Sequence, residues 1–461
     1  MTEASLGSLL DGDPDDIVAY LNSTATTRAE LRASVDRLGF QLRDAGLAGH
    51  VIGVLAANQP DAIAAWFAVW SVGGAFVPLN PRVPSAERDA FIASTGVDAV
   101  IDPPTLRSVP GAAESHADAG VAIVQFTSGT TGRPKAVPLR HDTVLDLLDG
   151  VIGSLRGGRP VAKRAPMPNL VPVSLSLWAG IYQVLFAFRV GAPVVLMERF
   201  EPVEFARLIG EFGIRSSVLP PAAMVMLARE ARVTSLEPLR YVRSVSAPLS
   251  PTHARDFHER FGVAILNGYG QTELGGEVVG WTADDWREFG AAKLGAIGRP
   301  HAGIEVRVRD AELQVRSRTA APPDRALGDR VTDDGWLRTG DLARIDADGF
   351  VWIEGRVSAM VNRGGLKVYP DEVEEHLREH PSVADAAIAG VPDDRLGEVP
   401  WAFVVVEPGA DLDADSLRDW CRARMAAYKV PAGITLVGEL PRNEIGKLLR
   451  QDLVPLVSRD G

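Results

Sequence analysis

The ten residues Phe126–Lys135, FTSGTTGRPK, combine hydroxyl groups, glycines and cations in one short loop. Gly129 and Gly132 allow the backbone to approach an anion closely. The side chains that could bind an anion are Thr127, Ser128, Thr130, Thr131, Arg133 and Lys135. The loop is not a Walker A motif, because Pro134 stands five residues after Gly129. The composition suits a polyphosphate, and a plain solvated turn is the alternative.

Two further segments place polar residues next to glycines. Asn267–Glu273, NGYGQTE, follows the apolar strand predicted over 264–266. The carboxyl ends of parallel strands bind ligands in α/β sheets, so Tyr269 could stack on a base there. Thr272 and Glu273 could hold a phosphate and Mg²⁺. In Leu337–Asp341, LRTGD, a carboxylate beside a glycine turn could accept two ribose hydroxyls. An ordinary turn is the alternative for each segment.

The last two segments carry cations. Gly355–Pro370 holds Arg356, Arg363 and Lys367 around a glycine pair, and a basic interdomain loop is the alternative. Pro441–Lys447, PRNEIGK, ends in a lysine that would ordinarily be a solvated surface residue.

The elements around these segments predict an α/β fold. Helical and apolar strand patterns alternate from Leu31 to about Leu266, which predicts βαβ units and a large doubly wound parallel region. From about 295 to 355, alternating strands with glycine and aspartate turns predict a small β unit. We therefore expect an N-terminal domain over 1–355 and a smaller, mobile α+β C-terminal domain over 356–461.

Composition excludes several classes of protein. The net charge of −12 argues against a nucleic-acid-binding surface, and the single cysteine, Cys421, excludes an intrachain disulfide framework. The acidic N-terminus lacks an apolar signal core, so we expect a cytoplasmic protein. The uncharged stretch 165–188 is interrupted by prolines in its first third, which favours a buried helix after Val173 over a membrane span.

The order of the five segments resembles the acyl-adenylate-forming superfamily, and in the form RGGLKVYPDEVE its acyl-CoA synthetase branch. The resemblance extends from Leu31 to Lys447. It implies an ATP-binding set with Mg²⁺ held by Glu273 and with Lys447, Glu273 and Thr272 as the catalytic residues. That set is Thr127, Ser128, Gly129, Thr130, Thr131, Gly132, Lys135, Asn267, Gly268, Tyr269, Gly270, Thr272, Asp341, Arg356 and Lys447.

The resemblance also implies individual roles. The loop Thr127–Lys135 would bind the β- and γ-phosphates and Tyr269 would stack on adenine. Asp341 would bind the ribose, and Lys447 would bridge the attacking carboxylate and the α-phosphate. A lysine and a metal at the α-phosphoryl group stabilise the charge that gathers there in the transition state.

A rotation of the C-terminal domain is implied for the second half-reaction. Lys447 would leave the site, and Gly364, Gly365 and Lys367 would admit the thiol of coenzyme A. Ser358 stands at the hinge position, where the family usually has Asp or Lys. A small polar residue can still absorb a backbone change.

The acyl pocket departs from the family pattern at two places. MPNLVPV, near 167–173, lacks the histidine common in acyl-CoA synthetases, and Ser174 occupies the place of the aspartate that binds an α-amino group. An unpaired ammonium would be costly there, so we disfavour α-amino acids. We expect a compact aromatic or medium acyl acid. The expected pocket residues are Val173, Ser174, Trp178, Tyr182, Met224, Ser246, Ala247, Leu274 and Gly275.

Three functions stay open at this point. The first is an AMP-forming acyl-CoA synthetase that uses a small carboxylate, ATP and CoA. The second is an acyl-AMP ligase that passes the acyl group to a separate carrier protein or an amine. The third is a non-catalytic nucleotide-binding regulatory protein, which the joint presence of Glu273, Asp341 and Lys447 argues against.

Overall fold

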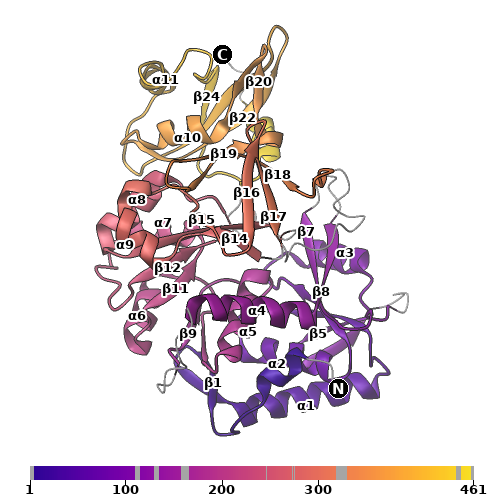
Figure 1. Ribbon diagram of the computed structural model, residues 1–461. Coiled ribbons are helices and arrows are strands. Elements are labelled where there is room, and N and C mark those ends of the chain that lie inside the picture. The colour runs from indigo at the N-terminus through magenta and orange to yellow at the C-terminus, as the bar shows by residue number, and fades with distance from the viewer. Residues whose placement is uncertain are drawn as a thin grey trace. The chain divides into compact units, whose positions relative to one another are not determined.

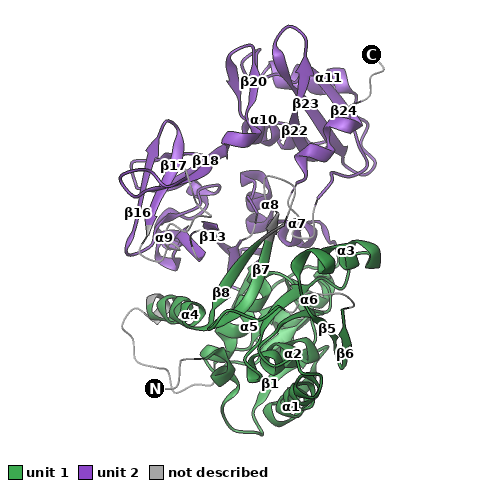
Figure 2. Ribbon diagram, turned by 90° about the vertical axis from the view of Figure 1, so that its right-hand side faces the viewer, with its two compact units in different colours: residues 1–218, 232–239 green, residues 219–231, 240–461 purple. Residues whose placement is uncertain are grey.

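The computed structural model describes residues 5–109, 115–128, 134–156, 166–245, 247–271, 274, 276–317, 330–442 and 448–457. The chain divides into two compact units, coloured separately in Figure 2. Unit 1 comprises Met1–Val218 and Arg232–Leu239, and unit 2 comprises Leu219–Ala231 and Arg240–Gly461. The predicted domain boundary at 355/356 lies within unit 2 and stays a prediction. Figure 1 labels the elements.

Unit 1 contains a six-stranded sheet in the order β6-β5-β3-β4-β7-β8. Its four inner strands are parallel, and an antiparallel strand flanks each side. The predicted βαβ pattern is therefore correct, while the two edge strands were not predicted. The strands are β3 (Val51–Leu55), β4 (Ala75–Leu79), β5 (Ala99–Asp102), β6 (Thr105–Ser108), β7 (Val121–Ser128) and β8 (Pro134–Arg140).

The helices of this region have clear local causes. Thr27 and Glu30 form a capping box at the start of α1 (Arg28–Asp44), and the helix buries a stripe of leucines and a valine at helical spacing. α2 (Pro60–Ser71) is apolar on nearly all sides and buried, with Trp66 stacked on Phe76. The remaining helices of this part are η1 (Leu6–Leu10), α3 (Ser85–Thr95) and α4 (His141–Arg156).

A second sheet of unit 1 has the order β2-β1-β10-β9. The helix expected after Val173 begins only at Trp178, because Asn58 holds the segment before it. The Asn58 amide donates to the carbonyls of Val173 and Met197 at 2.9 Å and accepts from the Leu175 N–H. The strands of this sheet and the nearby helices are β1 (Ile17–Leu21), β2 (Thr24–Thr27), β9 (Asn169–Val171), α5 (Trp178–Arg189), β10 (Val194–Leu196) and α6 (Pro202–Phe212). The next strand, β11 (Ser216–Leu219), is an edge strand of the sheet that contains β12 (Tyr241–Ser244). No helix among the described residues is long and apolar enough to span a bilayer.

In unit 2, β12 and β13 are parallel, and β14 and β15 continue the sheet antiparallel. β13 corrects the prediction, because it does not end at Leu266 but continues through Tyr269 to Gln271. Its second half pairs with β14 instead of forming a loop. The elements are α7 (Pro221–Arg229), β12 (Tyr241–Ser244), α8 (Pro251–Phe261), β13 (Ala264–Gln271), β14 (Gly276–Gly280), α9 (Ala283–Phe289), η3 (Gly290–Lys293) and β15 (Arg299–Pro300).

The predicted small β unit is an antiparallel sheet in the order β16-β17-β18-β19. The LRTGD segment, expected as a turn, lies inside strand β18, where Gly340 has φ +76° and the register with β17 shifts. The strands are β16 (Ile304–Arg309), β17 (Glu312–Ser317), β18 (Leu337–Ile345) and β19 (Val351–Arg356).

The C-terminal part has its own core between helices α10 and α11 and a sheet built on the long β22–β23 pair. Pro370 opens α10 at the predicted residue. The elements are η5 (Val357–Ala359), β20 (Val361–Arg363), β21 (Leu366–Val368), α10 (Pro370–Arg378), β22 (Val383–Asp393), β23 (Gly397–Val406), α11 (Ala414–Arg422), β24 (Gly433–Leu436), η6 (Arg450–Asp452) and η7 (Val454–Leu456).

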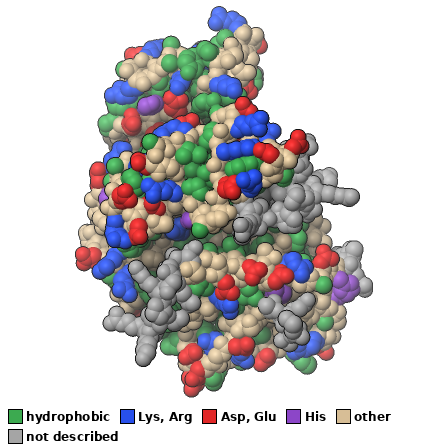
Figure 3. All heavy atoms as spheres, in the orientation of Figure 1, with side chains coloured by type: hydrophobic (Ala, Val, Ile, Leu, Met, Phe, Trp, Pro, Cys, Tyr) green, Lys and Arg blue, Asp and Glu red, His purple; other side chains and the backbone are tan. Residues whose placement is uncertain are grey.

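On the face drawn in Figure 3, acidic and basic side chains are interspersed and no broad basic patch is visible.

Candidate active site

A buried carboxylate, Asp341, joins three strands of unit 2. It lies on β18, opposite Arg356 of β19, and its side chain faces Tyr269 of β13. The Tyr269 hydroxyl donates to Oδ2 at 2.6 Å, and Arg356 Nε donates to Oδ1 at 2.8 Å. Asp341 is only 3% exposed, so these charge-assisted bonds replace its hydration. The structure thus brings together three residues that the sequence predicted for the nucleoside.

The backbone that carries Asp341 is held by buried polar groups. Thr339 Oγ1 donates to the Leu313 carbonyl at 2.7 Å and accepts from the Asp341 N–H. Glu312 accepts from the Gly340 N–H at 2.8 Å and from Arg338 Nε at 2.8 Å. The strand β17 therefore fixes the position of the carboxylate.

Two residues of this cluster were missed by sequence reasoning. Gln271 Nε2 lies 2.9 Å from Asp341 Oδ2 and 2.9 Å from the Thr339 carbonyl. Arg330 donates to Gln271 Oε1 at 2.9 Å, which orients the amide. Gln271 is part of NGYGQTE, and its amide, a hydrogen-bond donor within that motif, could have indicated a site residue. Arg330 precedes LRTGD by several residues, and no sequence motif indicated that it belongs to the site.

Tyr269 remains a hydrogen-bond donor because its phenol cannot ionise easily. Burial raises the pKa of Tyr269 far above its ordinary value, and the nearby Asp341 carboxylate raises it further. The ring packs beside the core formed by Leu274, Val279 and neighbouring residues. The ring is thereby fixed on one side by packing and at its tip by Asp341.

The other residues of this segment shape the backbone. The Asn267 carbonyl accepts from the Trp281 N–H at 2.9 Å, and its side chain is buried. A Cβ at Gly270 would overlap the Gly276 carbonyl, so only glycine allows β13 and β14 to approach this closely.

A second polar cluster lies on the same sheet, and the sequence did not predict it. Glu277 of β14 forms ion pairs with Arg243 of β12 and with His301, which follows β15. His301 Nε2 lies 2.9 Å from Glu277 Oε1, and the Arg243 guanidinium contacts the same oxygen. Arg243 also donates to the Trp281 carbonyl at 3.1 Å. These residues are far apart in sequence, so only the sheet brings them together.

Several predicted residues lie outside the described part of the chain. These are Gly129, Thr130, Thr131, Gly132, Ser246, Thr272, Glu273, Gly275 and Lys447. The backbone of Thr127 pairs with that of Lys135 across β7 and β8, and Ser128 pairs with Pro134. The described ends of the predicted phosphate-binding segment, 127–128 and 134–135, are thus antiparallel neighbours in the sheet.

The predicted pocket residues are found in both units. In unit 1, Val173 is buried, Ser174 Oγ lies 2.7 Å from Ser176 Oγ, and Trp178 contacts Tyr182 edge to face on α5. In unit 2, Met224 of α7 and Leu274 are buried, and Ala247 is half-buried.

The glycine pair predicted to admit a thiol forms the turn between β20 and β21. Gly364 and Gly365 have φ +59° and +90°, values that a two-residue hairpin turn requires. Lys367 is exposed on β21, and Ser358 is exposed in η5. Arg363 instead donates to the Tyr428 and Val430 carbonyls, so it stabilises its own module.

Among the residues that the structure describes, no group of three or more His, Cys, Asp or Glu side chains could hold a metal ion. A Mg²⁺ site made of one protein carboxylate and nucleotide phosphates would not require such a group.

The buried Asp341 carboxylate, on an α/β scaffold, could accept hydrogen bonds from the hydroxyl groups of a ligand. In agreement, residues 10–320 match the model of the AMP-binding enzyme family, and residues 372–447 match that of the AMP-binding enzyme C-terminal domain. The chain belongs to this family, and so to the acyl-adenylate-forming superfamily.

Curated proteins and solved structures agree with this assignment. Feruloyl-CoA synthase of an Amycolatopsis species is 30% identical, over 93% of this chain and 94% of its own. The amide bond synthetase McbA of Marinactinospora thermotolerans is 28% identical, with a TM-score of 0.81 and 98% of each chain covered. The o-succinylbenzoate CoA synthetase of Bacillus subtilis, solved with its acyl-adenylate, is 26% identical, with a TM-score of 0.81 and 97% of each chain covered.

Proposed function

We propose that the protein is an AMP-forming acyl-CoA synthetase. An oxygen of a carboxylate substrate attacks the α-phosphorus of ATP, the bond to the β-phosphate oxygen breaks, and pyrophosphate leaves. The thiolate of CoA then attacks the acyl carbon, and AMP leaves with the electrons of the broken C–O bond. The observation that carries this proposal is the buried Asp341 with Tyr269 and Arg356 around it.

The binding of the ribose follows from the acceptor capacity of Asp341. A carboxylate has about four acceptor sites. Tyr269, Gln271 and Arg356 already donate to this carboxylate. A ribose diol brings two donors, so one present donor must move or share its acceptor when the nucleotide binds. Tyr269 is the natural candidate, since its ring is also the proposed partner of adenine.

The remaining roles rest on the sequence. The loop of Thr127–Lys135 would hold the leaving phosphates, and Lys447 would neutralise charge between the carboxylate and the α-phosphate. Glu273 would hold Mg²⁺, which supplies charge neutralisation at the phosphates. The protein mainly positions its substrates, because the substrate carboxylate is itself the nucleophile.

The proposed acid is a compact aromatic or medium acyl acid. Within unit 1, the predicted pocket residues Trp178 and Tyr182 form an aromatic pair on α5, and aromatic side chains of this kind suit an apolar acid. Two relatives, feruloyl-CoA synthase and o-succinylbenzoate CoA synthetase, are named for aromatic acids.

A second candidate is an acyl-AMP ligase with another acceptor. Its support is the similarity to an amide bond synthetase over 98% of both chains. In that case an amine nitrogen, or the thiol of a carrier protein, would attack the same acyl carbon and release AMP.

Pyrophosphate exchange over a panel of carboxylates, followed by product analysis with CoA, tests the proposal. We expect exchange with aromatic acids and formation of acyl-CoA. Exchange with no thioester, but with an amide or a loaded carrier protein, would favour the second candidate. Exchange with no acid would favour a non-catalytic nucleotide-binding protein.

Lys447→Ala provides the control for the assigned role. It should abolish adenylation and largely spare thioester formation from a supplied acyl-AMP. Equal loss of both half-reactions in a folded variant would show that the role of Lys447 is wrong.

A further inference from the structure

The Glu277 carboxylate packs against Gly268 and Gly280, beside the proposed nucleoside site. A Cβ at Gly268 would overlap Oε2, and a Cβ at Gly280 would overlap Oε1. Gly268 immediately precedes Tyr269, and Gly275, predicted for the acyl pocket, stands two residues before Glu277. The charged group therefore occupies space that side chains at 268 and 280 would fill.

The two carboxylate oxygens have different surroundings. Arg243 and His301 both bind Oε1. Among the described residues, Oε2 has no hydrogen-bond partner, although the Glu277 side chain is only 24% exposed. Oε2 is not one of the fully buried polar atoms without a partner, so water can reach it in the free protein. A ligand that displaces this water must supply a donor in its place, or the charged acceptor is left unpaired.

The charge of the cluster restricts which donor fits. Arg243 already neutralises Glu277, and its guanidinium would oppose an ammonium ion nearby. A second carboxylate on the ligand would be repelled by Glu277. A neutral hydroxyl or ring N–H has neither penalty and can donate to Oε2.

We propose that Glu277, positioned by Arg243 and His301, selects carboxylic acids that carry a neutral hydrogen-bond donor. The substrate class is an aromatic acid with a hydroxyl or ring N–H group away from its carboxylate. This inference rests on the proposed function and sharpens it, because it adds a polar requirement to the expected aromatic acid.

The experiment compares matched acids in pyrophosphate exchange. Hydroxybenzoates are measured beside benzoate and the methoxybenzoates, and indole-3-acetate beside its N-methyl derivative. For the wild type we expect kcat/KM to be about 10-fold or more higher for the member with the donor, the effect of one hydrogen bond to a charged group. Glu277→Ala should reduce that ratio to about 3 or less, because the variant cannot accept the hydrogen bond.

Two further variants keep the test decisive. Glu277→Gln preserves the side-chain volume and should lose several-fold of the preference even if Glu277→Ala unfolds. Glu305→Ala breaks an exposed ion pair with Arg316 on β16–β17 and should leave the ratio unchanged. The proposal is overturned if the wild type shows no preference, or if the preference survives in a folded Glu277→Ala or Glu277→Gln. Absence of exchange with every acid would instead contradict the proposed function.

Discussion

Asp341 is the residue whose chemistry is most sharply defined. Its two oxygens accept from a phenol, an amide and a guanidinium, and the carboxylate is almost fully buried. Each of these partners donates, so both oxygens of Asp341 act as acceptors. If one oxygen is replaced by a donor group, that group therefore faces another hydrogen-bond donor, and the contact becomes unfavourable.

Asp341→Asn should raise the KM for ATP about 10- to 100-fold, since one oxygen becomes an NH₂ group facing donors. The measurement is steady-state exchange at varied ATP, with calorimetric binding of AMP. Asp334→Asn is the matched control, because Asp334 pairs with Arg307 on the same β unit and is largely exposed. An unchanged ATP KM in folded Asp341→Asn would contradict the nucleoside site.

At the scale of elements, the hairpin of β20 and β21 depends on two glycines in the left-handed region. Arg363 fixes the base of the hairpin through backbone carbonyls, and the Gly364 N–H donates to the Leu396 carbonyl at 2.8 Å. The tip is exposed, which leaves its backbone accessible to a second substrate.

Gly365→Ala should lower the CoA-dependent step about 10-fold and spare pyrophosphate exchange. A Cβ at Gly365 meets nothing within 4 Å, so the effect would come from the φ of +90°, at a cost of about 1–2 kcal/mol. Gly409→Ala is the matched control, because Gly409 has φ +83° and equally open surroundings. If the two variants formed acyl-CoA equally well, the β20–β21 hairpin would not be part of the thiol-binding site.

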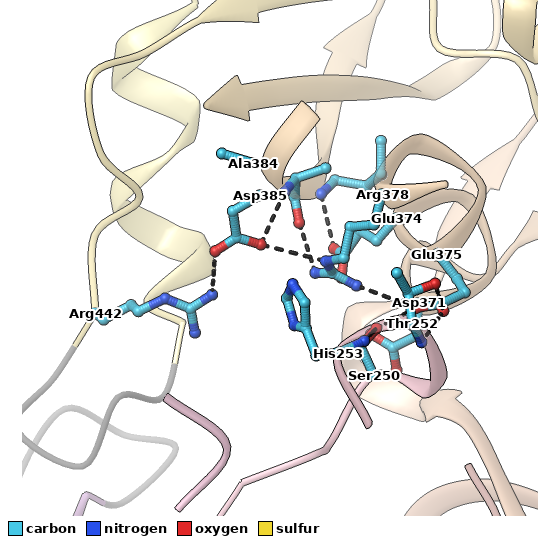
Figure 4. Close-up of polar contacts among 12 residues, drawn as sticks. Ser250, Thr252, His253, Asp371, Glu374, Glu375, Arg378, Ala384, Asp385 and Arg442 are labelled. Carbon is cyan, nitrogen blue, oxygen red and sulfur yellow. Dashed lines mark hydrogen bonds and ion pairs between the residues drawn. The ribbon is translucent and has the colours of Figure 1, made fainter. Parts of the chain in front are cut away.

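At the scale of the whole molecule, a polar network links α8 to the C-terminal part of unit 2. Ser250 and Thr252 donate to the Glu375 carboxylate at 2.7 and 2.8 Å. Arg378 pairs with Glu374 and Asp385, and Asp385 also binds Arg442. Figure 4 shows the His253 ring directed into this network, toward Arg378 and Asp385.

The network makes folding stability depend on pH through His253. Burial lowers the pKa of His253 to about 4 from an ordinary 6.5, and Arg378 contributes to the shift; Asp385 and Glu375 oppose it, and Arg229 supports it. Between these values the unfolded chain binds more protons, so stability falls as the pH drops from 6.5 toward 4. The loss attributable to His253, which is partly exposed, should be about 1–3 kcal/mol.

Denaturant unfolding between pH 4 and 8 measures this dependence. His253→Asn should show a shallower fall below pH 6.5 than the wild type, because asparagine does not titrate. Above pH 7 the slopes of the two proteins should agree. Parallel curves through the acidic range would show that His253 is not the group responsible.

Much of the fold and part of the site were predictable because their causes are local. The capping box of α1, the leucine stripe, the proline at the start of α10 and the glycines of the β20–β21 turn act within a few residues. The edge strands β6 and β8, and the continuation of β13 to Gln271, were missed. Their stability comes from partners elsewhere in the sheet.

The sequence by itself determined the class of protein, through the order of five polar segments, and it predicted Asp341, Tyr269 and Arg356. Only the tertiary structure decided which side chains share a site. Gln271 and Arg330 joined the Asp341 cluster, and Arg243, Glu277 and His301 formed a second one. The physical reason is that strand register brings distant residues within hydrogen-bond reach, and no local pattern records that register.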